Sequence, residues 1–357
     1  MLDTEQQTII VTGVSGNLGQ RLLPHLEGYR IIGLDLRPPA QGKLEHFVSM
    51  DLGEEPACRR LTDLIRETNT RAVIHLAYVS DSHRAGALDL DRMWQINVSG
   101  VARVMEAISV ANRYGSSVTR CIYPSSVSVY GPETPALVKE EYPLGAHTLP
   151  YAIHKMESDR AVQFRAESLG DCTTYMLRPH IFTGANSQSY LVGALRGIAT
   201  GNGERGRKMR TRGKRLPLRL PFGAEYLGKL LQFVHVDDMA RLLTWLLRRD
   251  PEGNRLHILN VAGRGGPITM ERAAQMANAR IARAPMFACR LVFQKLWDWG
   301  ISAIPPEAFP YLIGSYTMDT NRLKHLLGSD YDKVMQHTVE DALAGSFTEQ
   351  NTNAASA

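Results

Sequence analysis

The sequence predicts an α/β fold, a doubly wound parallel sheet with a smaller, mostly helical C-terminal lobe. Short and nearly continuous apolar runs alternate with helical patterns through the first half of the chain, which is typical of a sheet covered by helices on both faces. A glycine-rich turn joins the first apolar run to the first helical pattern. The 357 residues are 44% hydrophobic and 22% charged, so a sizeable core is expected.

The expected strands are runs in which apolar residues follow one another almost without interruption: 8–12, 30–35, 46–51, 72–77, 120–126, 173–179 and 256–263. Between them, helical patterns predict helices over 18–28, 56–68, 91–115 and 152–168. The last strand belongs to the second half of the chain. The sheet is therefore expected to draw on both halves.

Composition narrows the function classes. Four cysteines, Cys58, Cys121, Cys172 and Cys289, lie far apart, so neither a disulfide framework nor a metal site is expected. We expect a cytoplasmic protein, because there is no apolar run of eighteen residues and no leader pattern at the N-terminus. The net charge of +5 depends on residues 204–219, which hold eight Lys or Arg against one Glu. One such cluster is a weak sign of nucleic-acid binding, so no nucleic-acid partner is expected.

The glycine-rich turn predicts a dinucleotide site of the Rossmann type. Its residues are Gly13, Gly16, Asn17, Leu18 and Gly19. Such a turn lets backbone N–H groups approach a pyrophosphate at the start of a helix. Asp35 ends the second strand, sixteen residues after Gly19, where a carboxylate accepts hydrogen bonds from the ribose hydroxyls of NAD and repels the 2′-phosphate of NADP. Arg37 keeps NADP as an alternative cofactor, because an arginine would neutralise the charge of that phosphate.

These patterns predict two lobes. We expect an NAD-binding Rossmann domain over 1–183, with its sheet completed by about 230–265. A substrate-binding lobe is expected over 184–229 and 266–347, followed by a disordered tail over 348–357.

The Gly-x-x-Gly-x-x-Gly spacing resembles the extended short-chain dehydrogenase/reductase family, of the NAD-dependent epimerase/dehydratase type. Other motifs of that family follow in order: Asp51-Leu52, His75-Leu76-Ala77-Tyr78, Asn97-Val98-Ser99-Gly100, Ser125-Ser126-Val127-Ser128-Val129-Tyr130-Gly131 and Tyr151-Ala152-Ile153-His154-Lys155. The resemblance covers roughly residues 8 to 263. It implies further cofactor contacts at Asp51, Leu52, Leu76, Ala77, Tyr78, Asn97, Ser125, Pro179, His180 and Ile181.

Chemistry explains the grouping of Ser126, Tyr151 and Lys155. Tyr151 and Lys155 are four residues apart on a predicted helix, so both project from one face. An ammonium group near the phenol is expected to lower its pKa from about 10 toward neutral pH. Tyr151 would then deprotonate a carbinol that Ser126 also holds, while a hydride passes to the nicotinamide, or run the reverse. We expect these three residues to be catalytic, with Lys155 and Tyr151 also contacting the cofactor.

Other polar residues have more than one interpretation. His180 is a candidate acid or base, but a histidine packed beside the cofactor is the preferred interpretation. His235, Asp237 and Asp238 resemble a family motif and are interpreted as structural, with an Asp capping the following helix. Asn186 and Arg212 are candidate substrate contacts. The basic segment 204–219 either closes over an anionic substrate or is a solvated loop, with membrane or nucleic-acid attachment a lesser alternative.

One absence narrows the reaction that the resemblance implies. Dehydratases of the family carry an acidic pair after the catalytic hydroxyl residue, whereas Val127 and Ser128 follow Ser126 here. The leading hypothesis is an NAD-dependent epimerase of a nucleotide sugar that acts through a transient ketone. The alternatives are a reductase or dehydrogenase of a non-nucleotide ketone or hydroxysteroid-like substrate, and a non-catalytic NAD(P)-binding regulator. The sequence leaves open whether the protein forms a homodimer.

Overall fold

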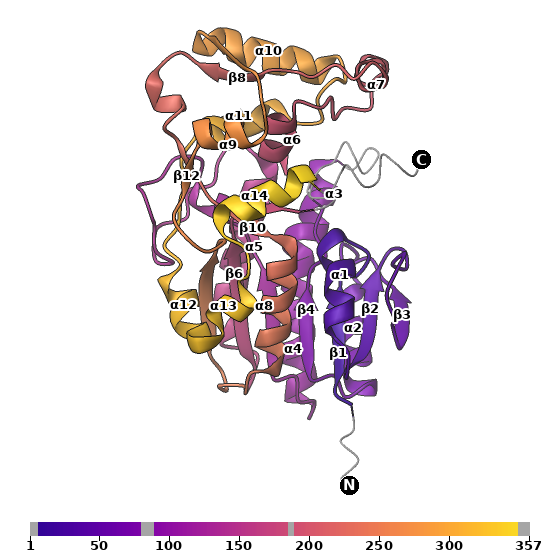
Figure 1. Cartoon of the computed structure of the whole chain (residues 1–357). Coiled ribbons are helices and arrows are strands. Elements are labelled where there is room, and N and C mark those ends of the chain that lie inside the picture. Colours follow the sequence, from indigo (N-terminus) through magenta and orange to yellow (C-terminus); the bar gives the residue numbers. More distant parts are fainter. Residues whose placement is uncertain (1–5, 80–88, 185–188, 349–357) are drawn as a thin grey trace.

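Seven parallel strands form the central sheet of the computed structural model, which describes residues 6–79, 89–184 and 189–348 (Figure 1). In chain order the strands are β1 (Thr8–Thr12), β2 (Arg30–Asp35), β3 (His46–Ser49), β4 (Ala72–His75), β5 (Arg120–Pro124), β6 (Thr173–Pro179) and β11 (Leu256–Val261). Their spatial order is β11-β6-β5-β4-β1-β2-β3, and every neighbouring pair is parallel. The predicted doubly wound sheet is confirmed, and β11 does come from the second half of the chain.

Four strands end two residues earlier than the apolar runs predicted, which affects the site directly. These are β3, β4, β5 and β11. The residues that leave the ladder at β4 and β5, Leu76-Ala77 and Ser125-Ser126, are motif residues that form loops at the carboxyl edge of the sheet. That edge is where ligands bind in open α/β sheets, at the point where the strand order reverses beside β1.

Helices cover both faces of the sheet because its strands are apolar on both sides. Alternate residues of β1 enter different cores: Ile9 and Val11 pack on one face and Ile10 on the other. The first face is covered by α1 (Asn17–Leu22), the 3-10 turn η1 (Leu23–His25) and α8 (Val236–Arg248). The second is covered by α2 (Ala57–Glu67), α4 (Gly100–Arg113) and α5 (Pro150–Ala166), with α3 (Leu90–Trp94) and the π-helical turn η2 (Gln95–Ser99) leading into α4.

The remaining elements lie mainly above the carboxyl edge of the sheet (Figure 1). The helices there are α6 (Tyr190–Arg196), α7 (Glu204–Thr211), α9 (Met270–Met276), α10 (Met286–Asp298), α11 (Phe309–Ile313) and α14 (Val339–Thr348). Three two-stranded sheets accompany them: β8 (Leu218–Pro221) with β13 (Ile281–Ala284), β7 (Ile181–Thr183) with β10 (Phe233–His235), and β9 (Leu230–Leu231) with β12 (Ile268–Thr269).

The division of the chain into two lobes stays a prediction. Two late helices, α12 (Asn321–Leu327) and α13 (Tyr331–Val334), return to the central sheet and its helices and pack on β11 and α8. Short 3-10 turns complete the described elements: η3 (Val127–Tyr130), η4 (Ala224–Tyr226), η5 (Pro306–Ala308) and η6 (Gly328–Asp330). Across the described ranges, none of the helices is long and apolar enough to cross a membrane.

The basic segment is partly helical, whereas the sequence predicted a loop. Helix α7 begins after Gly203, and Glu204 forms an (i, i+4) ion pair with Lys208 at 2.6 Å. The acidic residue in the first turn and the basic residues in the last also complement the helix dipole. Gly206 packs against the backbone of Gly300, so tertiary contact reinforces a helix of weak apolar pattern.

Candidate active site

The glycine-rich turn brings the end of β1 against the loop that follows β4. Gly13 has φ +68°, and a Cβ atom there would lie 2.4 Å from the backbone nitrogen of Ala77. A Cβ atom on Gly19 would lie 2.5 Å from the carbonyl oxygen of Val14. Gly16 caps α1 without any side-chain hydrogen bond, and together with Asn17 and Leu18 it lines a cavity of about 540 Å³. The turn therefore offers bare backbone to that cavity, as a cradle for a pyrophosphate requires.

Asp35 ends β2 and is held beside this turn by two backbone hydrogen bonds. Its Oδ2 accepts a hydrogen bond from the Ser15 backbone at 3.0 Å, and its Oδ1 accepts one from the Leu36 backbone at 2.7 Å. Each carboxylate oxygen has a further lone pair available for a ribose hydroxyl. Arg37 is exposed, and its carbonyl accepts a hydrogen bond from the Ser15 hydroxyl.

Other predicted cofactor contacts support loops of the site. Asp51 accepts a hydrogen bond from the Gly53 backbone at 2.8 Å and pairs with Arg92, while Leu52 is buried. Asn97 is also buried, and its amide bonds both the N–H and the carbonyl of Val79 at 2.8 Å. These two bonds fix the loop after β4 where it passes the glycine turn.

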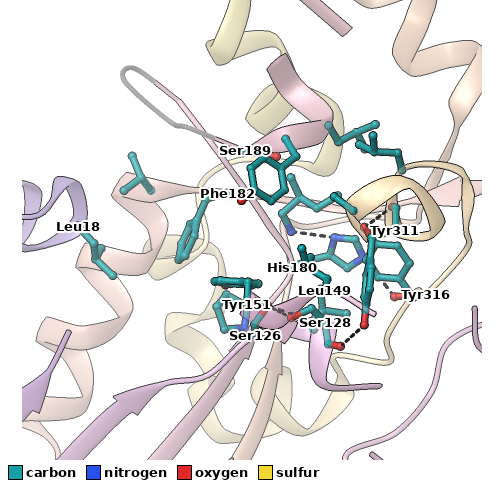
Figure 2. Close-up of a pocket in the computed structure, with 18 of the residues that line it drawn as sticks. Leu18, Ser126, Ser128, Leu149, Tyr151, His180, Phe182, Ser189, Tyr311 and Tyr316 are labelled. Carbon is teal, nitrogen blue, oxygen red and sulfur yellow. Dashed lines mark hydrogen bonds between the residues drawn. The ribbon is translucent and has the colours of Figure 1, made fainter. Parts of the chain in front are cut away.

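Ser126 and Tyr151 meet on one wall of the cavity (Figure 2). Ser126 precedes η3, and its Oγ accepts hydrogen bonds from the backbone and the hydroxyl of Ser128 at 3.2 and 3.0 Å. Tyr151 lies in the first turn of α5 and hydrogen-bonds with Ser126. The structure thus brings together two of the three predicted catalytic side chains at the surface of one cavity.

Lys155 lies one helical turn further and beneath this wall. Its Nζ donates to the carbonyl of Pro124 at 2.8 Å and lies 3.8 Å from the ring centroid of Tyr78. The Tyr78 hydroxyl in turn donates to the carbonyl of Tyr151 at 2.9 Å. Tyr78 therefore packs between the two residues of the Tyr-x-x-x-Lys pair.

The expected lowering of the Tyr151 pKa is not observed. Burial raises the pKa of Tyr151 above its usual value, and the hydrogen bond with Ser126 opposes this only in part. Burial also lowers the pKa of Lys155 to about 7, against the opposing charge of Asp159. Desolvation is the largest cause of both pKa shifts, since it disfavours the charged form of each group.

His180 has the geometry of a packed, neutral histidine. Its Nδ1 accepts from the backbone of Ile181 at 2.9 Å, so its Nε2 carries the hydrogen and donates to the carbonyl of Tyr316 at 3.3 Å. Its ring stacks on Tyr316, and burial lowers its pKa to about 3. Pro179, His180 and Ile181 all line the cavity.

A histidine caps the N-terminus of helix α8, whereas the sequence predicted an aspartate cap. The His235 side chain accepts the hydrogen bond from the backbone of Asp237 at 3.3 Å. Asp238 instead bonds the backbone of His337 at 3.1 Å and pairs with Arg241. These residues serve packing, as predicted, but histidine provides the cap.

The far wall of the cavity is aromatic and aliphatic, and the sequence did not identify it. The apolar lining there includes Leu149, Phe182, Tyr190, Leu191, Ala308, Tyr311, Leu312 and Tyr316. Figure 2 labels Leu149, Phe182, Tyr311 and Tyr316. The first and last of these residues, Leu149 and Tyr316, are more than 160 positions apart in the sequence. No local pattern therefore marks them as one surface. Among the described residues that line the cavity, none is Lys, Arg, Asp or Glu.

Two predicted substrate contacts are not brought to this wall. Arg212 is exposed at the end of α7 and is not part of the cavity lining. Asn186 lies outside the described residues. The roles of both residues remain predictions.

Comparison with known proteins agrees with this geometry. A model of the NAD dependent epimerase/dehydratase family matches residues 9–262. An uncharacterized epimerase/dehydratase of Staphylococcus saprophyticus is 24% identical over 170 residues, which are 45% of this chain and 49% of the relative. The UDP-glucose 4-epimerase of Bacillus subtilis is 29% identical over 161 residues, 42% of this chain and 44% of the relative. The chain thus spans about half the length of the curated relatives it matches.

Solved structures share the fold over nearly the whole chain. MoeE5 in complex with UDP-glucuronic acid and NAD is similar at a TM-score of 0.64 and 19% identity, covering 97% of this chain and 99% of MoeE5. The Thermus thermophilus UDP-glucose 4-epimerase complex with NAD gives a TM-score of 0.62 at 18% identity, covering 96% and 98% of the two chains. Bordetella bronchiseptica WbmG in complex with NAD gives 0.64 at 14% identity, covering 99% and 96%.

Proposed function

Since the chain belongs to the NAD dependent epimerase/dehydratase family, we propose that it binds NAD along the glycine-rich turn and acts on a carbinol or ketone in the adjoining cavity. One observation carries this proposal: the glycine turn and the hydrogen-bonded pair of Ser126 and Tyr151 line the same cavity. When bound, NAD supplies the hydride acceptor and donor. Gly16, Asn17, Leu18 and Asp35 are the residues that would hold it.

Side chains of the protein transfer the proton of the substrate hydroxyl. Tyr151 accepts the carbinol proton, and Ser126 holds the same substrate oxygen by its hydroxyl. A protonated Lys155 stabilises the phenolate, whereas the neutral lysine does not. Because the pKa of Lys155 is about 7, this assistance declines above neutral pH, while formation of the phenolate becomes easier.

Two overall reactions use this arrangement. Epimerisation of a nucleotide sugar is supported by the similarity to the B. subtilis UDP-glucose 4-epimerase and by the lack of an acidic pair after Ser126. Net oxidation or reduction of a non-nucleotide substrate is supported by the cavity itself. Apart from the glycine turn, the described lining of the cavity is largely aromatic and aliphatic and includes no Lys, Arg, Asp or Glu, so this part of the cavity suits an uncharged group of the substrate.

A product assay distinguishes the two reactions. We expect neutral ketones and secondary alcohols to change the NADH concentration stoichiometrically with product, because the cavity favours uncharged groups. A UDP-hexose panel run in parallel is the comparison, with sugar isomers separated by chromatography and NADH followed by absorbance. Isomer formation without NADH accumulation would establish epimerisation and reject the neutral-substrate assignment.

Cofactor choice is predicted from Asp35. We expect NAD to bind more tightly than NADP, because the 2′-phosphate would meet the Asp35 carboxylate. Asp35→Ala should weaken NAD binding by about 10- to 100-fold, since each hydrogen bond to a charged group contributes about 1.5–3 kcal/mol. Calorimetric titration of both cofactors measures this, and Asp63→Ala on the exposed surface of α2 is the matched control. Tighter NADP binding by the unmodified protein would contradict the assignment and make Arg37 the phosphate contact.

A further inference from the structure

A surface rich in exposed apolar and basic side chains lies at the end of the molecule opposite the start of β1. We call it the distal surface and define it as residues 204–222 and 280–299, which include α7, β8, β13 and α10 (Figure 1). Five large apolar side chains are exposed on it: Phe287 (73%), Phe222 (60%), Leu291 (57%), Trp299 (48%) and Ile281 (38%). Exposed apolar side chains gathered on one surface mark interaction sites more often than single exposed residues do.

Helix α10 presents these features along one stripe. Phe287, Arg290, Leu291, Gln294 and Lys295 are all exposed and recur every three or four residues. On the opposite side, Cys289 is buried near β8 and β13, with its thiol 3.7 Å from the carbonyl oxygen of Ala284. The exposed stripe therefore combines two large apolar side chains with two cations.

The charged residues of the distal surface are mostly basic. Its sequence holds twelve Lys or Arg against two acidic residues, Glu204 and Asp298, for a net charge of +10. The formal net charge of the whole chain is +5, so the remainder carries −5. The basic excess of the protein is thus concentrated on the surface that also exposes Phe287 and Leu291.

Backbone packing holds the two segments together. Gly203 and Gly300 are so close that a Cβ atom on Gly203 would lie 2.9 Å from the Cα of Gly300. The Arg205 guanidinium lies 4.8 Å from the ring centroid of Trp299. Arg210 donates to the carbonyls of Ala199 and Gly201 at 2.7 Å. The basic and apolar groups therefore belong to one packed unit.

We propose that the distal surface docks the protein on the surface of an anionic lipid bilayer. Helices that lie in a membrane interface combine Phe, Leu or Trp with Lys or Arg in this way, and each cation near an anionic leaflet adds to the attraction. A second copy of the chain is disfavoured as the occupant, because a two-fold interface would place +10 against +10. A nucleic acid would satisfy the charge but would leave Phe287 and Leu291 without an apolar environment. The proposal does not depend on the proposed reaction.

Vesicle co-sedimentation tests the proposal with the full-length protein. We expect binding to phosphatidylcholine vesicles that contain phosphatidylglycerol, little binding to phosphatidylcholine alone, and weaker binding as salt is raised. Phe287→Ser/Leu291→Ser and Arg290→Gln/Lys295→Gln should each weaken binding at least tenfold. Phe164→Ser is the matched control, because Phe164 on α5 is 85% exposed but lies outside the distal surface. This variant should bind vesicles as well as the unmodified protein does.

NAD affinity and circular dichroism report whether the variants are folded, since none of the replaced residues lines the cavity. Failure of the folded unmodified protein to bind anionic vesicles would overturn the proposal. So would unchanged binding by the Phe287→Ser/Leu291→Ser variant. Binding to duplex DNA without binding to vesicles would identify nucleic acid as the occupant instead, and a dimer that these substitutions dissociate would identify a second copy.

Discussion

Replacing Tyr151 with phenylalanine is expected to lower kcat by a factor of about 10² to 10⁴ and to leave NAD binding nearly intact. The phenylalanine ring packs in the same place, but it has no oxygen to accept or return the substrate proton. Turnover of the substrate found in the product assay, together with calorimetric NAD titration, measures both effects.

Two further variants make this result interpretable. Tyr311→Phe is the matched control, because Tyr311 lines the same cavity and its hydroxyl makes only long bonds of 3.4 Å to the carbonyls of Ser128 and His147. It should keep kcat within a few-fold. Lys155→Ala should impair both turnover and NAD binding. If Tyr151→Phe retained activity within a few-fold of the unmodified protein, Tyr151 would not be the proton acceptor.

The sequence predicted the sheet because its signal is local. A strand covered on both faces must be apolar at consecutive positions, as Ile9, Ile10 and Val11 are, and two separate cores receive those side chains. The same logic placed the glycine turn and Asp35 at one edge of the sheet. Four of the seven strand ends were predicted two residues too late, because an apolar residue such as Leu76 continues the pattern after the ladder has ended.

The cavity wall and the proton energetics could not be predicted in this way. Tyr190, Tyr311 and Tyr316 join Ser126 only through tertiary packing, so each one reads as an ordinary core residue in the sequence. The spacing of Tyr151 and Lys155 fixed the shared helix face but not their burial. Burial determines the direction of both pKa shifts, and it lowers the pKa of Lys155 to about 7. Helix α7 depended likewise on a distant backbone contact at Gly300.

Replacing Arg178 with leucine is expected to destabilise the protein by about 3–5 kcal/mol, because it leaves the carboxylate of Asp159 buried without a cation. Arg178 and Asp159 are 1% and 0% exposed, and two parallel bonds of 2.9 Å join the guanidinium to the carboxylate. Arg178 also donates to the Tyr130 hydroxyl at 2.7 Å and to the Glu140 carbonyl at 2.8 Å. Urea unfolding monitored by fluorescence measures the loss.

The double variant Arg178→Leu/Asp159→Leu separates charge burial from lost packing. If an uncompensated charge causes the damage, the double variant loses about 1–3 kcal/mol less than the sum of the two single variants. Additive losses would show instead that the pair acts only through packing volume. Asp159 also accepts a hydrogen bond from Ser125 at 2.9 Å and raises the pKa of Lys155 against the effect of burial. Removing the charge of Asp159 therefore favours the neutral form of Lys155 at neutral pH. Folded variants without Asp159 should lose turnover for this reason. Arg178 acts on the site only through the fold.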